Sequence, residues 1–127
     1  MTQSTRFQPS GTLEQILGDR VVKASSSLGS FAVELESGRG LLFSASDGSG
    51  RPEVVAELVD ACNLPSLAEA VCTVDWSWIE GSKIAEAGAR GPGVKIVMEP
   101  AGPLEIGVGV WQSKPYLFFQ PYKPATT

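Results

Sequence analysis

A weak internal repeat constrains this chain more than any other feature of its sequence. Without a gap, segment 16–43 aligns with segment 79–106 at an offset of 63 residues. Five aligned positions are identical: Ile16/Ile79, Gly18/Gly81, Ala24/Ala87, Glu36/Glu99 and Leu41/Leu104. A unit that cannot cover its own apolar face packs on a second copy, so the repeat predicts a pseudo-symmetric core with a cleft at the seam. Unrelated hairpins share the same alternation, because the pleat imposes it; duplication and coincidence both stay open.

Each half has the pattern of a three-stranded antiparallel meander. Phe31, Val33 and Leu35 point to one face of a strand over 30–36, while the intervening residues point to the other. Glycine- and proline-containing turns separate the apolar runs. The predicted strands are 20–24, 30–36 and 41–45 in the first half, and 83–87, 94–99 and 104–111 in the second. A final strand over 116–120 has no predicted counterpart in the first half.

The segment between the meanders predicts an amphipathic helix over residues 52–62. Val54, Val55, Leu58, Val59 and Cys62 recur at helical spacing, and acidic residues lie on the opposite side. Pro52 suits the first turn of such a helix.

Segment 71–78 fits two interpretations. With a period of two, Cys72, Val74, Trp76 and Trp78 share one face, and this favours a strand that breaks near Ser77. Through the repeat, Asp75 aligns with Thr12, where a capping pattern predicts a short helical turn that ends at Gly18. Asp75 would then cap a similar turn that ends at Gly81. We favour the strand.

The expected fold is α+β. Two related antiparallel meanders, with six to eight strands in total, form a small barrel or sandwich, and one amphipathic helix is inserted between them. With 127 residues the chain has the size of one domain over 1–127. We expect loosely ordered tails at 1–11 and 121–127.

Composition excludes several classes of partner and site. The net charge is −4 and the ten basic residues are scattered singly, which argues against nucleic-acid binding. No apolar stretch approaches the roughly 20 residues of a membrane span, and the first residues lack the apolar core of a secretory signal. Cys62 and Cys72 fit no metal-site spacing and predict reduced, buried thiols in a cytoplasmic protein. We expect neither a metal nor a cofactor.

Candidate catalytic groups are few. The chain has no histidine, which removes the commonest general base and metal ligand. Glu36 and Glu99 match across the repeat, and a pseudo-twofold arrangement would let them act as paired acids or bind a cation together. The simpler interpretation is two solvated acids at strand ends.

The most suggestive chemical feature is the uneven distribution of aromatic residues. Of ten, seven follow position 75. The candidate binding residues among the large apolar side chains are Trp76, Trp78, Trp111, Tyr116 and Phe118. They either fill the core or form an exposed patch, and interfaces favour such side chains.

Three functions follow from these patterns. The leading hypothesis is a non-catalytic protein-interaction module of the inhibitor, immunity or adaptor kind, which binds another protein or self-associates. The alternative is a small-ligand-binding protein with a pocket at the seam between the repeats. The third is a carboxylate-dependent enzyme, which needs two acids in one cleft.

Overall fold

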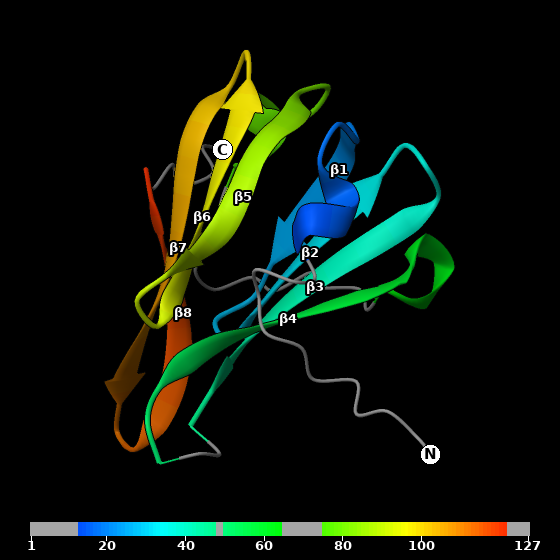
Figure 1. Cartoon of the computed structure of the whole chain (residues 1–127). Coiled ribbons are helices and arrows are strands. Elements are labelled where there is room, and N and C mark those ends of the chain that lie inside the picture. The colour runs from blue at the N-terminus through cyan, green and yellow to red at the C-terminus, as the bar shows by residue number, and fades with distance from the viewer. Residues whose placement is uncertain (1–12, 48–49, 65–74, 122–127) are drawn as a thin grey trace.

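Eight strands form two four-stranded antiparallel sheets, which stand side by side in Figure 1. The structure is a computed structural model and describes residues 13–47, 50–64 and 75–121. The first sheet has the order β1 (Val21–Ser26), β2 (Ser30–Leu35), β3 (Arg39–Ser46) and β4 (Glu53–Asp60). The second has the order β5 (Lys83–Arg90), β6 (Gly93–Glu99), β7 (Gly102–Trp111) and β8 (Lys114–Gln120). Residues 1–11 and 122–127 of the predicted tails, together with Cys72, lie outside the described residues.

The two sheets follow the same strand register at an offset of 63. Val21 pairs with Leu35 in the first sheet, and Ile84 pairs with Met98 in the second. A shift in register, typical of a β-bulge, follows at the same place in both first strands, between Val21 and Lys23 and between Ile84 and Glu86. The predicted antiparallel meanders and their similarity are therefore present in the structure, whereas duplication stays a prediction.

The similarity extends to the fourth strand of each sheet. Phe43 pairs with Ala56 across β3 and β4, and Ile106 pairs with Phe119 across β7 and β8. Strand β8 therefore has a counterpart, β4, which the sequence interpretation missed.

The hydrophobic core follows the same 63-residue repeat. In the described part of the chain, its twenty buried apolar residues form ten pairs whose members lie 63 positions apart. The pairs are Leu13/Trp76, Ile16/Ile79, Val21/Ile84, Phe31/Val94, Val33/Ile96, Leu35/Met98, Leu41/Leu104, Phe43/Ile106, Val54/Leu117 and Ala56/Phe119. Each inward position of one sheet thus has an inward equivalent in the other.

Main-chain hydrogen bonds join the two sheets reciprocally at β1 and β5. The Gly18 N–H donates to the Ile84 carbonyl at 2.8 Å, and the Gly81 N–H donates to the Val21 carbonyl at 2.7 Å. Arg20 and Lys83, themselves equivalent, face each other in an antiparallel bridge. The pseudo-twofold axis passes through this bridge, because each residue there meets its own counterpart.

A second set of bonds ties the outer strands to the opposite sheet. The Val54 N–H of β4 donates to the Pro92 carbonyl at 2.8 Å, and the Leu117 N–H of β8 donates to the Leu28 carbonyl at 2.9 Å. These bonds occupy donors of strands that stand at the sheet edges, where unpaired groups invite association.

The predicted helix over 52–62 is wrong, and with it the α+β class. The segment forms β4, and the short 3₁₀ turn η2 (Ala61–Asn63) follows it. Val54 and Ala56 are buried, while Val55 lies on the other face, so the operative period is two. Valine is β-branched and favours strands, and pairing with all eight residues of β3 outweighs the helical spacing.

The strand predicted over 71–78 is also wrong within the described residues, where the interpretation through the repeat holds. Segment 77–79 is the 3₁₀ turn η3 (Ser77–Ile79), and it aligns with η1 (Glu14–Ile16). The Asp75 carboxylate accepts hydrogen bonds from the Ser77 N–H at 3.0 Å and the Ser77 hydroxyl at 2.7 Å. Gly18 and Gly81 end the two turns with φ of 87° and 85°. None of the described helical turns is long and apolar enough to cross a membrane.

Candidate functional site

The five aromatic candidates divide between the core and the surface. Trp76 is only 4% exposed, and its indole N–H donates to the Ser26 hydroxyl at 2.9 Å. Its ring centroid lies 4.4 Å from that of Phe31 and 4.8 Å from that of Phe119. Trp78 is partly buried, with its ring centroid 6.4 Å from that of Trp76. Trp76 therefore contacts an aromatic ring of each sheet, and neither tryptophan is among the exposed large apolar side chains of the described residues.

The other three candidates gather on the outer side of the β7–β8 hairpin. Trp111 is 67% exposed and Phe118 is 44% exposed, whereas Tyr116 is intermediate. The ring centroids of Tyr116 and Phe118 lie 6.5 Å apart. We call Trp111, Tyr116 and Phe118 the aromatic face.

Two glycines of β7 allow the aromatic rings to lie across the neighbouring strand. Gly107 pairs with Phe118, and Gly109 pairs with Tyr116. A Cβ atom at Gly107 would overlap the Phe118 ring, and one at Gly109 would lie 2.7 Å from the Tyr116 ring. Each ring therefore covers backbone that another side chain would otherwise cover.

The matching strands of the first sheet carry no such face. At the positions equivalent to Tyr116 and Phe118, the first half has Glu53 and Val55. The scaffold therefore forms without aromatic residues at these positions.

Two hollows lie on the same outer side of the second sheet. One, of about 280 Å³, is lined by side chains and backbone of β5 and β6, including Glu86, Gly88, Arg90 and Lys95. The other, of about 220 Å³, is bounded by Arg90 and Phe118. Sequence reasoning missed Arg90, Lys95 and the glycines of this surface, because only the strand register brings them together. At the seam, where a ligand pocket was predicted, core side chains of the two sheets meet, among them Phe31 and Phe119, and the pocket stays a prediction.

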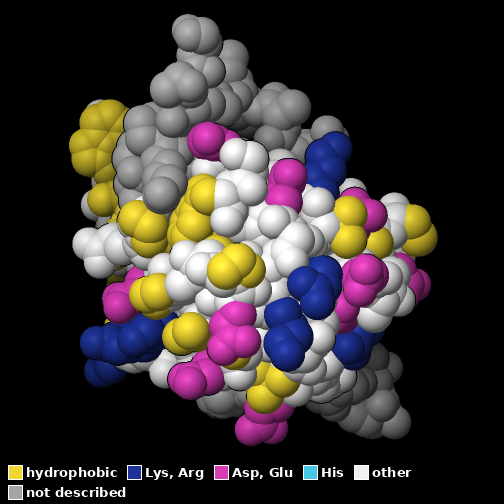
Figure 2. Space-filling view, turned by 90° about the horizontal axis from the view of Figure 1, so that it is seen from above, with side chains coloured by type: hydrophobic (Ala, Val, Ile, Leu, Met, Phe, Trp, Pro, Cys, Tyr) yellow, Lys and Arg dark blue, Asp and Glu magenta, His cyan; other side chains and the backbone are white. Residues whose placement is uncertain are grey.

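Glu36 and Glu99 lie at equivalent, exposed strand ends. The Glu36 N–H donates to the Arg20 carbonyl at 2.9 Å, and Glu99 pairs with Lys83. Since Arg20 and Lys83 bridge each other, two basic residues stand between the acids in this row. Their joint action stays a prediction. On the face shown in Figure 2, acidic and basic side chains are likewise intermingled.

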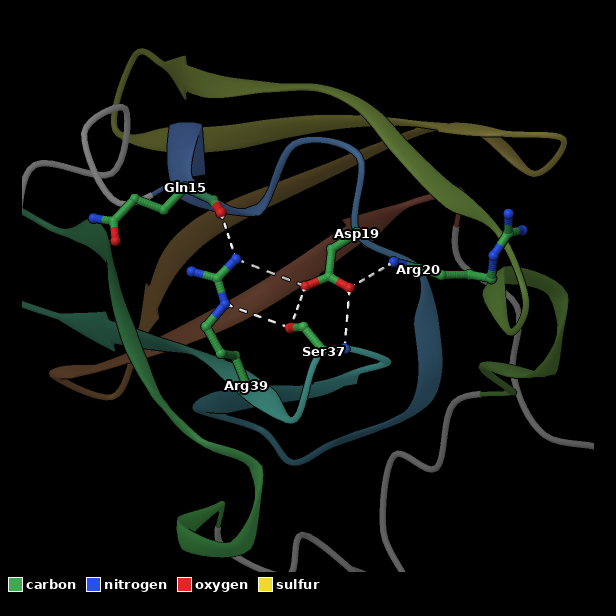
Figure 3. Close-up of polar contacts among 5 residues, drawn as sticks. All are labelled: Gln15, Asp19, Arg20, Ser37 and Arg39. Carbon is green, nitrogen blue, oxygen red and sulfur yellow. Dashed lines mark hydrogen bonds and ion pairs between the residues drawn. The ribbon is translucent and has the colours of Figure 1, made fainter.

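A polar cluster ties the start of the first half together (Figure 3). The Asp19 carboxylate accepts from the Arg20 N–H at 2.9 Å and from the Ser37 hydroxyl at 2.5 Å, and lies 3.8 Å from the Arg39 guanidinium. Arg39 also donates to the Gln15 carbonyl at 2.6 Å. The Asp19 side chain is 9% exposed and its partners come from its own half, so the cluster braces η1 and the β2–β3 turn.

The described residues contain no group of three or more acidic or cysteine side chains that would hold a metal ion. Cys62, predicted to be buried, is instead exposed as a free thiol. On the second sheet, charged side chains and the Phe118 ring line the two hollows.

Comparison with protein families, with curated proteins and with solved structures found no match to this chain.

Proposed function

We propose that this protein is a non-catalytic interaction module, of the inhibitor, immunity or adaptor kind, that contacts a partner protein through the aromatic face. One observation carries the proposal: Tyr116 and Phe118 occupy outward positions where the equivalent strand of the first sheet has Glu53 and Val55. The first sheet forms without aromatic residues at these positions, and this supports a role for the rings in contact with a partner.

Exposure and chemistry support the same surface. Trp111 stands 67% exposed at the end of β7, beside the half-exposed Val110. Tryptophan and tyrosine are enriched among the residues that dominate binding energy at protein interfaces. The outward side of the first sheet has less accessible surface at two positions, because Leu64 lies over Gly40 and Ala32 is buried.

Two substitutions test the proposal, because neither removes a core contact. Trp111→Ser truncates an exposed ring, and Phe118→Val installs the residue that the first sheet carries at the equivalent position. Both variants should keep the wild-type far-UV circular dichroism. A partner captured quantitatively from native lysate by the wild type should bind each variant about tenfold more weakly or worse.

The matched control is Val55→Ala, the equivalent outward position of the first sheet, which should retain the partner. The proposal is wrong if Trp111→Ser and Phe118→Val capture the same proteins as the wild type with equal yield.

A further inference from the structure

One row of four residues crosses the outer side of the second sheet and differs completely from its equivalent. Arg90 pairs with Gly93, and Gly107 pairs with Phe118. Gly93 lies against Gly107, because an added Cβ at Gly93 would lie 3.3 Å from the Gly107 Cα. The row therefore runs from β5 to β8 in the order Arg90, Gly93, Gly107 and Phe118. The equivalent residues of the first half, in the same order, are Ser27, Ser30, Ser44 and Val55. We call the first set the charged–aromatic row.

The two central glycines lie at the bottom of this row, where Gly93 is buried and Gly107 lies beneath the Phe118 ring. A Cβ atom at Gly93 would overlap the Ile106 carbonyl oxygen, and one at Gly107 would overlap the Phe118 ring. The hollow of about 220 Å³ lies along the row, with Arg90 at one end and Phe118 at the other. Neither glycine adds a side chain of its own to this surface, whereas the first sheet has serines at both equivalent positions.

The charge of the row is positive although the whole chain carries −4. Within the described part of the chain, no carboxylate forms an ion pair with Arg90. Glu105 also lines the hollow, but it pairs across the strands with Lys95, so these two charges sum to zero. The Arg90 guanidinium therefore determines which charge a ligand of this hollow should carry, and guanidinium groups bind carboxylates well.

We infer that the charged–aromatic row binds an extended acidic–apolar segment of the partner protein. An Asp or Glu carboxylate meets Arg90, and a large apolar side chain enters the hollow against Phe118. This inference rests on the proposed function, whose aromatic face shares Phe118.

The geometry also indicates the spacing of the two side chains. From β5 to β8 the row spans about 14 Å, so its midpoint, between Gly93 and Gly107, lies about 7 Å from Arg90. Side chains two residues apart in an extended chain share one face and stand about 7 Å apart. The recognised pattern is therefore an acidic residue at position i and an aromatic or large aliphatic residue at i+2.

Short peptides test this directly. The probe is an N-acetylated, C-amidated heptapeptide with Glu and Phe two residues apart in a glycine background, titrated into ¹⁵N-labelled protein. The amide signals of Gly93 and Gly107 should shift in a saturable way. The Gln–Phe and Glu–Ala peptides should each bind about tenfold more weakly, because each lacks one of the two contacts.

Variants of the protein complete the test. Arg90→Ser and Phe118→Val, which install the first-sheet residues, should abolish the shifts, whereas Lys114→Ser, outside the row, should preserve them. Equal binding of the Glu and Gln peptides, or no saturable shift at Gly93 and Gly107 at millimolar peptide, overturns the inference. If Trp111→Ser loses the natural partner while Arg90→Ser keeps it, the inference fails and the proposed function stands.

Discussion

Gly18 and Gly81 show how much of this fold depends on single backbone conformations. Both have positive φ, and both donate a main-chain hydrogen bond to the opposite half. Neither has a neighbour within 4 Å of an added Cβ, so only the backbone conformation demands glycine. The positive φ of these two glycines therefore shapes the turn and also places the N–H group that joins the two sheets.

Replacing either glycine by alanine should therefore destabilise the protein by a similar amount. Gly18→Ala and Gly81→Ala should each lower the free energy of unfolding by about 1–2 kcal/mol, because a side chain disfavours the left-handed region. Urea denaturation followed by circular dichroism measures this. Gly29→Ala is the control, because Gly29 has equal space and no positive φ, and it should change stability little. Equal losses at all three glycines would contradict the explanation.

Some candidate residues could be predicted from the sequence and others could not, depending on whether a local pattern marks them. The uneven aromatic composition drew attention to Trp111, Tyr116 and Phe118, but it could not separate these more exposed side chains from the buried Trp76. Arg90 carries no local pattern at all. Its position in a row with Phe118 depends on three strand pairings, which no segment of sequence encodes alone.

At the scale of elements, β4 is the instructive case. Val54, Val55, Leu58 and Val59 satisfy helical spacing, yet Val54, Ala56 and Leu58 also alternate, and a short apolar run permits both periods. The repeat itself indicates a strand here, because at an offset of 63 residues 53–57 align with 116–120, which was correctly predicted as a strand. The other seven strands were predicted near their observed bounds, because their alternation is flanked by turn residues.

The two neighbouring valines of β4 distinguish strand from helix experimentally. Val54 is 2% exposed in the core, whereas Val55 lies on the outward face. Val54→Ala should lower the free energy of unfolding by about 2 kcal/mol through lost apolar burial, and Val55→Ala by well under 1 kcal/mol. Chemical denaturation of the two variants checks this. Similar losses from both would favour the helix, in which the two valines share one face.

At the scale of the whole molecule, neither sheet has a core of its own. The rings of Phe31 from the first sheet and Phe119 from the second lie with centroids 5.2 Å apart, and Trp76 contacts both. Each sheet completes the burial of the other, and main-chain bonds hold them at both ends. The two sheets should therefore fold and unfold as one unit.

This cooperativity can be measured with two probes in one denaturation experiment. Far-UV circular dichroism reports strands of both sheets, while tryptophan fluorescence reports mainly the buried Trp76 and the partly buried Trp78, because Trp111 is already exposed in the folded protein. The two transitions should coincide, and amide hydrogen exchange in β2 and β6 should reach a common limiting stability. Two separate transitions would show that the sheets are independent.

The reciprocal bonds at the seam have a consequence for how such a protein changes over time. Gly18, Ile84, Gly81 and Val21 join the halves through main-chain atoms, so most neighbouring side chains can vary without opening the joint. Each half is then free to specialise. The first half has the Asp19 cluster, where the second half has Ser82, and the second half has the charged–aromatic row. A symmetric frame thus permits the two halves to differ in their polar clusters and outer surfaces while the joint between them stays the same.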